Sequence, residues 1–320
     1  MEQSGKKFIG ESTIMIKPNL FIPGFSKAGT TALISYLSQH KDIFAPWRKE
    51  PHTLSLAKEL PSWFRTRYKM GTLNYNSYLK LYSNTKDYLY RVDGSTSYTF
   101  YADNAYKIKE FNNDAKVIIC IREQRSRLVS SYLFTYPNHK ISNFNYWIDK
   151  YFINEINTFL FYDKVKTYYK VFGDNLRIID NNDLKNEPQY VMDMIFNFLN
   201  LEPIKIDIVY RNPSMVTPYD NLLYRYLIFI TREILVRILY MMRTLNVEHA
   251  FWTIINNLRY KSSKGFIEKK AKSSNNKLFI DMIPQNIKDI LDDDYNSTLK
   301  FAKDNNILLE AKNKITYNRY

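Results

Sequence analysis

Short apolar runs alternate with amphipathic stretches along the chain, and this alternation is the first indication of its fold. The runs at 20–22, 88–92 and 176–180 each predict a strand, and the run at 115–121 is apolar almost throughout. A strand without polar alternation is typical of a parallel sheet that is buried on both faces. Strands of this kind, separated by helices, predict an α/β fold with a central parallel sheet.

Helical spacing of apolar residues is clearest in three places. After the first strand, one side of a helix that we expect to end near Gln39 carries Ala32, Leu33, Tyr36 and Leu37. A second predicted helix, 188–199, begins with proline at a favoured position, and its apolar stripe contains Val191, Met194, Ile195, Phe198 and Leu199. A final helix is predicted from about 284 to 303. The segments 53–87 and 140–170 are helical in outline and rich in aromatic residues.

The stretch 222–245 is mostly apolar, which first suggests a membrane span. Charged residues interrupt it, however, and they gather toward one side of a helical wheel: Arg225, Arg232, Glu233, Arg237 and Arg243. The pattern therefore predicts an amphipathic helix, within a helical insertion near 220–258. Its apolar face could pack into the core or lie on an anionic membrane, and the residues leave both interpretations open.

A length of 320 residues suffices for one large domain with a full core or for two small domains. We predict a single domain over 1–320, with its core at about 18–305. Cys120 is the only cysteine, and the four histidines show no metal-ligand spacing, so we expect neither an intrachain disulfide nor a metal. No apolar run long enough for a signal peptide follows the first lysines. We therefore expect a cytoplasmic location, at the inner face of the membrane if the amphipathic helix binds lipid.

The net charge of +14, from 46 Lys and Arg against 32 Asp and Glu, indicates an anionic partner. Nucleic acid, an anionic membrane surface and small anionic ligands all fit this balance. The basic residues lie in loops and one helix without a known nucleic-acid-binding motif, so we expect no nucleic-acid partner. A basic nucleic-acid-binding protein stays open as an alternative.

The turn after the first strand holds two of the chain's eight glycines, Gly24 and Gly29. Glycine lets the backbone approach a ligand closely, and amide groups at a helix N-terminus bind anions. The glycine spacing fits the G-x-x-x-x-G-K-[ST] loop of nucleotide-binding proteins, but Thr30 stands where that loop needs lysine. The loop's lysine, Lys27, lies inside it instead. A terminal phosphate or sulfate bound without metal therefore fits best, and a P-loop nucleotide or small-molecule kinase is the alternative.

The residues G-F-S-K-A-G-T-T-A-L at 24–33 resemble the 5′-phosphosulfate loop of sulfotransferases that use 3′-phosphoadenosine 5′-phosphosulfate (PAPS). They are most similar to the branch of heparan sulfate sulfotransferases and bacterial carbohydrate sulfotransferases. The resemblance implies a three-layer P-loop-like α/β fold, with helices on both faces of the sheet. It also implies that Lys27 stabilises charge on the leaving phosphate. The donor would be bound by Ser26, Lys27, Ala28, Gly29, Thr30, Thr31 and Ala32.

A proline-broken segment, 42–52, follows the first predicted helix and is expected to be irregular. Such a segment can lie over the carboxyl edge of an open parallel sheet, where ligands bind. Its K-E-P-H sequence resembles the K-E-x-H segment of the same branch, in which glutamate is the catalytic base. The resemblance implies that Glu50 deprotonates the acceptor. His52 is the alternative base, because a histidine has this role in cytosolic relatives.

The junction at 122–132 resembles the family's 3′-phosphate motif, R-x-P-x-x-R-A-x-S-x-Y. Gln124 and Leu128 replace its proline and alanine, and the matching residues are Arg122, Arg127, Ser130 and Tyr132. A guanidinium at a strand end and a hydroxyl two turns into the next helix can hold one phosphate together. The resemblance implies that Arg122 and Ser130 bind the 3′-phosphate.

Two further stretches resemble the family only in part. At 93–98 the sequence D-G-S-T-S-Y stands where the family often has E-K-[ST]-P-x-Y, so Gly94 replaces a lysine. The stretch 259–265 resembles a loop that closes over PAPS, which implies donor contacts from Lys261, Lys264 and Gly265. The same Lys-, Ser- and Asn-rich stretch also fits a flexible solvated loop, and the residues do not decide between the two.

These motifs together predict an enzyme that transfers a sulfuryl group from PAPS to a hydroxyl or amine, without a metal. The second product would be 3′,5′-phosphoadenosine. The resemblance and the aromatic-rich segments favour a carbohydrate or glycolipid acceptor. The sequence does not decide between O- and N-sulfation, and it leaves the oligomeric state open.

Overall fold

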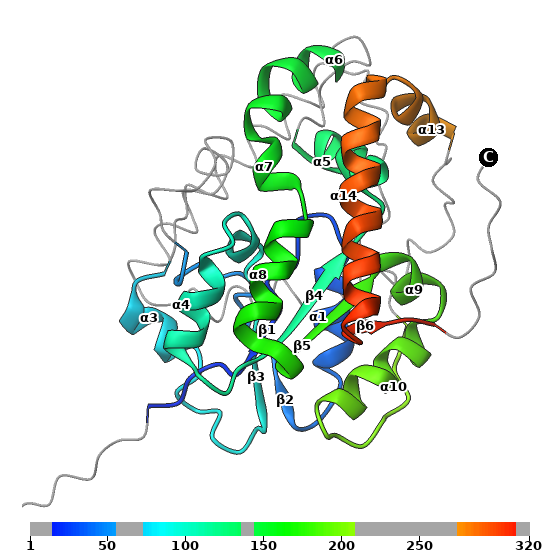
Figure 1. Cartoon of the computed structure of the whole chain (residues 1–320). Helices are drawn as coiled ribbons and strands as arrows, with labels where there is room; N and C mark the ends of the chain where they lie inside the picture. The colour runs from blue at the N-terminus through cyan, green and yellow to red at the C-terminus, as the bar shows by residue number, and fades with distance from the viewer. Residues whose placement is uncertain (1–14, 56–72, 136–143, 209–273, 312–320) are drawn as a thin grey trace, which may run out of the picture.

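The computed structural model describes residues 15–55, 73–135, 144–208 and 274–311, and a parallel sheet lies at its centre (Figure 1). Six strands form this sheet in the order β2-β3-β1-β4-β5-β6, and every neighbouring pair is parallel. The strands are β1 (Leu20–Phe21), β2 (Ile43–Phe44), β3 (Tyr90–Asp93), β4 (Lys116–Ile121), β5 (Leu176–Asp180) and β6 (Leu308–Leu309). This arrangement confirms the predicted α/β fold with a central parallel sheet.

Strand β1 lies where the strand order reverses. The chain leaves β1 for β2 on the far side of β3, and later crosses from β3 past β1 to β4. In open parallel sheets, ligands bind at such a reversal, outside the carboxyl ends of the strands. The ends of β1 and β4 carry the loop and the arginine motif that the sequence singled out. The topology therefore brings both motifs to one edge of the sheet.

Helices cover both faces of the sheet, and Figure 1 shows α8 in front of the strands and α1 behind them. The front layer contains α4 (Asn104–Phe111), α8 (Tyr162–Phe172) and α14 (Gln285–Asp304), and α8 contacts the other two. The rear layer contains α1 (Thr30–Leu37), α9 (Asn181–Asn186) and α10 (Pro188–Phe198). Helices on both sides of one sheet give the predicted three-layer arrangement.

The longest pairing in the sheet joins β4 and β5, and most of their residues are buried. The side chains at 117–121 are 0% exposed, and they stand in register with Leu176–Asp180. Burying an isoleucine side chain fully contributes about 1.5–3 kcal/mol. The apolar residues on both faces of β4 therefore anchor the strand end from which the arginine motif begins.

A second hydrophobic cluster lies beside the sheet, where α5 (Gln124–Thr135) packs against α13 (Ser274–Asp281) and α14. Tyr132 of the arginine motif is fully buried there, and its ring lies 4.9 Å from that of Phe144 and 5.7 Å from that of Phe279. Tyr132 is thus a packing residue that fixes the position of α5.

Short elements complete the described chain. Between α5 and α8 lie α6 (Phe144–Trp147), a π-helix η4 (Ile148–Phe152), η5 (Ile153–Glu155) and α7 (Ile156–Phe159). The others are α3 (Tyr75–Lys80), η2 (Thr96–Thr99) and η6 (Gly173–Asn175).

Most of the predicted elements occur close to the expected residues, and α10 and α14 match the predicted helices 188–199 and 284–303. Strand β2 is an exception, because it lies inside the segment that was expected to be irregular. Among its described residues, the aromatic segment 53–87 forms one helix, α3. Tyr78 and Tyr82 of that segment are 0% exposed and belong to the core.

The predicted amphipathic insertion near 220–258, including 222–245, lies outside the described residues. Across the described ranges, no helix is both long and apolar enough to cross a membrane. A single domain over 1–320 stays a prediction.

Candidate active site

The loop between β1 and α1 is shaped by its two glycines. A Cβ atom at Gly24 would lie 2.0 Å from Cγ2 of Thr30, and one at Gly29 would lie 2.1 Å from Nδ2 of Asn181. Gly29 also has a φ of +97°, a left-handed conformation that other residues rarely adopt. In the loop that the sequence singled out, close packing therefore favours glycine at 24, and the backbone conformation favours it at 29.

This loop ends at the N-terminus of α1. Gly29 precedes the helix, and no side chain of the described residues caps it. The amide of Ala28 donates to the carbonyl of Phe25 at 3.1 Å, so it is used inside the loop. Unpaired amides at a helix N-terminus, together with the helix dipole, favour an anion. The first-turn amides at Thr30 and Thr31 are thus the ones that we expect to meet a ligand.

Two arginines of the second motif hold the carbonyl groups of this loop. Nη1 of Arg122 donates to the carbonyl of Lys27 at 3.1 Å, and Nε of Arg127 donates to that of Ser26 at 3.0 Å. Lys27 has a φ of +67°, an uncommon conformation for a residue with a side chain. Such conformations persist where surrounding contacts hold them. The structure therefore joins the two motifs, although they are far apart in the sequence.

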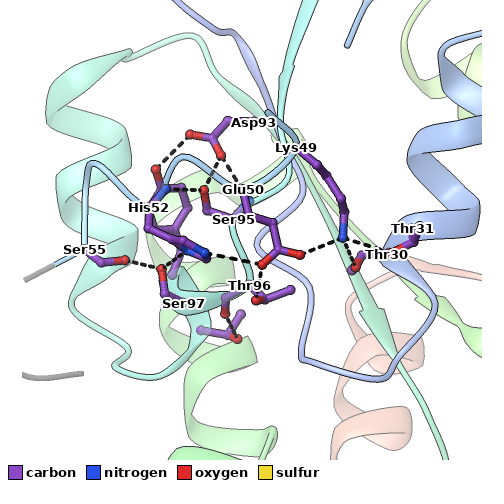
Figure 2. A network of polar contacts seen from close by, with 12 residues as sticks. Thr30, Thr31, Lys49, Glu50, His52, Ser55, Asp93, Ser95, Thr96 and Ser97 are labelled. Carbon is purple, nitrogen blue, oxygen red and sulfur yellow. Dashed lines mark hydrogen bonds and ion pairs between the residues drawn. The ribbon is translucent and has the colours of Figure 1, made fainter. Parts of the chain in front are cut away.

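Lys49 links the loop to the predicted base (Figure 2). Its ammonium group donates to Oγ1 of Thr30 at 3.0 Å, to Oγ1 of Thr31 at 3.1 Å and to Oε1 of Glu50 at 2.9 Å. These bonds use all three hydrogen-bond donors of the ammonium group. The hydroxyls at the start of α1 and the Glu50 carboxylate therefore lie on either side of one nitrogen atom. The K-E-P-H motif contains Lys49, but it does not predict the contacts of Lys49 with Thr30 and Thr31.

The Glu50 carboxylate is partly buried, accepts hydrogen bonds from Lys49 and Thr96, and lies close to His52. Oγ1 of Thr96 donates to Oε2 at 2.7 Å, and Nε2 of His52 lies 3.5 Å from the same oxygen. Burial raises the pKa of Glu50, but the charge of Lys49, the charge of His52 when it is protonated, and the hydrogen bonds from Lys49 and Thr96 outweigh it. Together they lower the pKa of Glu50 to about 2. Glu50 is therefore ionised at neutral pH, which is the form that can accept a proton.

His52 is buried next to Glu50, with 3% of its surface exposed (Figure 2). Its backbone amide donates to Oγ of Ser95 at 2.9 Å, and its Nδ1 lies 2.8 Å from Oγ of Ser97. Burial lowers the pKa of the imidazole to about 4, so His52 is neutral at neutral pH. Of the two predicted bases, Glu50 is the more exposed, and His52 lies buried beside it.

A buried carboxylate, Asp93, supports this part of the site. It is 0% exposed and accepts hydrogen bonds from the hydroxyls of Tyr78 at 2.6 Å, Tyr98 at 2.8 Å and Ser95 at 2.6 Å. Burial raises its pKa, and the hydrogen bonds oppose that rise. Because Ser95 is fixed in this way, its oxygen can accept the amide of His52. The partial family match at 93–98 was the available sequence signal for this network, and it was not recognised.

At Gly94, where the family often has lysine, a side chain would have to displace Ile34 and would press on the Lys49 backbone. A Cβ atom there would be 2.2 Å from Cδ1 of Ile34, and its amide donates to the carbonyl of Lys49 at 3.2 Å. Where the family often has a lysine side chain, this chain therefore has close packing between the end of β3, helix α1 and the Lys49 backbone.

The residues predicted to bind the 3′-phosphate lie at the end of β4 and on α5. Arg122 directly follows β4, Ser130 lies two turns into α5, and both are partly exposed. Arg122 is next to the loop after β1 through its bond to Lys27. Contact between Ser130 and a phosphate stays a prediction.

The other predicted donor contacts, from Lys261, Lys264 and Gly265, lie outside the described residues, and they stay predictions. In the part of the chain that the structure describes, no group of three or more His, Cys, Asp or Glu side chains could hold a metal ion.

Known protein families provide an independent comparison with this geometry. The sulfotransferase domain family matches residues 17–215, a range that includes the loop after β1, the K-E-P-H segment and the arginine motif. The chain belongs to the sulfotransferase family. Membership favours sulfuryl transfer over the kinase and nucleic-acid-binding alternatives.

Solved structures were compared as well. The crystal structure of a sulfotransferase from Alicyclobacillus acidocaldarius is 22% identical, with a TM-score of 0.52, and the match covers 71% of this chain and 96% of that one. It supports the sulfotransferase fold. Sulfotransferase domains from the curacin biosynthetic pathway and from the Synechococcus PCC 7002 olefin synthase are each 16% identical, with TM-scores of 0.42. Those matches cover 64% and 66% of this chain and 81% and 82% of theirs. A search of curated proteins gave no match.

Proposed function

We propose that this sulfotransferase transfers a sulfuryl group from PAPS to a hydroxyl or amine of a carbohydrate or glycolipid. The position of Lys49 carries the proposal, because one ammonium group contacts both the hydroxyls at the start of α1 and the Glu50 carboxylate. In-line transfer needs the leaving phosphate on one side of sulfur and the acceptor on the other. The loop after β1 could hold the leaving phosphate, and Glu50 could deprotonate the acceptor. The two lie close enough together to act on one sulfuryl group between them.

The residues present fit PAPS as the donor. Its 5′-phosphosulfate suits a glycine-shaped loop that ends at a helix N-terminus, and its 3′-phosphate suits Arg122 with Ser130. When bound, the donor supplies the activated sulfuryl group. On the protein side, the proposed 5′ contacts come from Ser26, Lys27, Ala28, Gly29, Thr30, Thr31 and Ala32.

Glu50 has the role of general base in the proposed reaction. It takes the acceptor's proton while the acceptor oxygen or nitrogen forms its bond to sulfur. The bond between sulfur and the oxygen of the 5′-phosphate breaks, and negative charge develops on the departing phosphate. Lys27 and the first-turn amides of α1 stabilise that charge, because they are already oriented before the reaction begins.

Lys49 couples the two halves of this reaction. Its charge keeps Glu50 ionised, but it also makes Glu50 a weak base, because a pKa of about 2 reflects a stabilised carboxylate. An anionic sulfuryl group next to Thr30 and Thr31 would compete with Glu50 for the ammonium group. The basicity of Glu50 would then rise when the donor is in place.

The acceptor proposal depends on the resemblance to carbohydrate sulfotransferases. Tyr78 and Tyr82, which belong to an aromatic segment that could have formed a sugar-binding surface, are 0% exposed. Tyr75 of the same segment is 46% exposed. The described aromatic residues therefore add little to the proposal, and an acceptor screen has to identify the substrate.

We also propose a cytoplasmic location, with peripheral contact to the inner face of the membrane through 222–245. Flotation with anionic liposomes tests this contact. Wild-type binding that Ile234→Glu removes would support the proposal, and absence of wild-type binding would contradict it.

Calorimetry with 3′,5′-phosphoadenosine, followed by an acceptor screen with labelled sulfate, tests the main proposal. We expect Lys27→Ala to lose most of its turnover. Glu50→Gln should lose turnover but bind 3′,5′-phosphoadenosine as tightly as the wild type. Lys41→Ala is the matched control, because the Lys41 side chain is 88% exposed. Near wild-type rates in both site variants would contradict the residue roles, and a wild-type protein without affinity for 3′,5′-phosphoadenosine would contradict the donor.

A further inference from the structure

Arg127 is a buried charge in an unexpected position. It matches the second arginine of the 3′-phosphate motif, yet it is only 3% exposed. Burying an ionised guanidinium costs free energy unless hydrogen bonds and a compensating charge surround it. The partners of Arg127 therefore indicate its role.

The guanidinium group of Arg127 holds the loop after β1. Its Nε donates to the carbonyl of Ser26 at 3.0 Å, and its Nη1 donates to the carbonyl of Phe159 at 2.7 Å and to Oε1 of Gln124 at 3.0 Å. The planar fork of arginine can fix several acceptors at once, which a lysine ammonium does less well. Arg127 thus ties the loop to the start of α5 and the end of α7.

Aromatic rings line the remaining surroundings of this group. Cζ of Arg127 lies 3.5 Å from the ring centroid of Phe159, 4.8 Å from that of Phe161 and 5.2 Å from that of Phe25. Cation–π contacts strengthen when they are shielded from water. Phe25 is next to Ser26 in the loop, so Arg127 contacts the loop through both a ring and a carbonyl.

Gln124 connects Arg127 to a carboxylate. Its Nε2 donates to Asp294 on α14, and Asp294 also accepts the backbone amides of Phe161 at 2.8 Å and Tyr162 at 3.0 Å. This arrangement turns Oε1 of Gln124 toward Arg127. Gln124 stands where the family motif has proline, so the connection is a departure of this chain from that motif.

We infer that Arg127 positions the loop for the 5′-phosphosulfate, with Gln124 and Asp294 as its supports, and does not bind the 3′-phosphate. The inference rests on the proposed function, which assigns the ligand of the loop. The carbonyl and N–H of a trans peptide point in opposite directions. By holding the Ser26 carbonyl, Arg127 therefore fixes the amide of Lys27 to point away from the buried guanidinium. Arg122, which is partly exposed, is the arginine of the motif that we expect to meet the 3′-phosphate.

Three nucleotides separate the two possible roles: 3′,5′-phosphoadenosine, 5′-AMP and 3′-AMP. Arg127→Lys keeps the charge but loses the fork of donors. We expect this variant to bind 3′,5′-phosphoadenosine and 5′-AMP about tenfold more weakly in calorimetry, as for one lost hydrogen bond to a charged group. Its affinity for 3′-AMP should be unchanged. Gln124→Ala should show the same pattern to a smaller degree. Weaker binding of 3′-AMP with unchanged binding of 5′-AMP would overturn the inference. Equal losses of affinity for all three nucleotides would overturn it as well.

Two variants of α5 serve as controls for this experiment. Arg125→Met should leave all three affinities unchanged, because Arg125 pairs with Asp292 and both are partly exposed. Ser130→Ala should show the opposite pattern from Arg127→Lys: weaker binding of 3′-AMP and unchanged binding of 5′-AMP.

Hydrogen exchange separates a failure of this inference from a failure of the proposed function, because it needs no ligand. We expect Arg127→Lys to speed exchange of the loop amide at Ala28 about tenfold or more, while the amides of β4 stay slow. If the wild type binds none of the nucleotides but this acceleration occurs, the donor is wrong and the positioning role stands. Unchanged exchange in Arg127→Lys would overturn the positioning role, whatever the protein binds.

Discussion

At Lys49, one ammonium group contacts two threonine hydroxyls and a carboxylate, and this geometry governs the protonation of Glu50. Lys49 makes the largest favourable contribution to the ionised form of Glu50, against the opposing effect of burial. In the proposed reaction, this shared contact would make the binding of the donor and the basicity of Glu50 dependent on each other.

Replacing Lys49 by Met tests this dependence. The pKa of Glu50 should rise, because burial then acts with less opposition, so the acid limb of the kcat profile should move to higher pH. Turnover should fall by about tenfold or more, since the charge next to the reacting group is lost. The measurement is turnover against pH with labelled sulfate, and Lys41→Met is the control. An acid limb at the same pH in both proteins would show that Lys49 does not control the pKa of the catalytic base.

The sequence identified Glu50 and His52 as the two candidates for the catalytic base, but it did not predict that His52 is buried and neutral while Glu50 is ionised. The motif K-E-P-H places both near the acceptor, yet burial of His52 depends on Ser95 and Ser97, which come from the segment after β3. The contacts of Lys49 with Thr30 and Thr31 depend on how the segment 45–51 returns over the sheet. No spacing within a four-residue motif contains that information.

Among the elements, the loop between β1 and α1 depends most on its neighbours. Gly24 faces Thr30 of the following helix, and Gly29 faces Asn181 at the start of α9. The loop therefore takes its shape only when β4, β5 and their helices are in place.

Gly24→Ala tests how tightly this loop is packed. The new Cβ would lie 2.0 Å from Cγ2 of Thr30, so we expect the free energy of unfolding to fall by about 1–3 kcal/mol. Thr30→Ser removes that methyl group and keeps the hydroxyl that accepts from Lys49. The double variant should regain most of the lost stability in chemical denaturation, relative to Thr30→Ser alone. A double variant as unstable as Gly24→Ala would mean that another contact limits this position.

Elements with long patterns were predictable, whereas two of the three described two-residue strands were not. The continuous apolar run of β4 and the helical stripe of α10 each extend over enough residues to show a period. Strands β2 and β6 have two residues each, so they have no period to detect, and pairing with β3 and β5 defines them.

For the whole molecule, the buried imidazole of His52 ties stability to pH. Its pKa in the folded protein is lowered from 6.5 to about 4, so the unfolded chain binds a proton at higher pH than the folded chain. Stability should therefore decline as the pH falls from about 6.5 to about 4, by up to about 3 kcal/mol. The carboxylate of Glu50 acts in the same direction at lower pH, because its stabilisation is present above about 4.5 and is lost toward about 2.

Denaturation at a series of pH values measures this decline. His52→Gln should lose less stability than the wild type between pH 7 and pH 4, because it has no imidazole to protonate on unfolding. An equal loss in both proteins would assign the acid sensitivity to other groups.

The sequence predicted the class of the fold and, through the resemblance, the family, but it did not predict the strand order. Apolar runs report that a strand is buried, whereas its neighbours are chosen by the connections between strands. The order β2-β3-β1-β4-β5-β6 is what places Arg122 and Arg127 beside the loop at Ser26 and Lys27. The resemblance supplied both motifs, and the topology explains why they meet at one edge of the sheet.

A ribosome makes the loop at 22–29 long before it makes Asp294. Until α14 has emerged, Gln124 and the amides of Phe161 and Tyr162 lack the acceptor that they share in the finished protein. A buried donor without its acceptor costs free energy, so the support of Arg127 through Gln124 is complete only when Asp294 is in place. Helix α14 is therefore the last described helix in the chain to contribute to the support of Arg127 and of the loop that it holds.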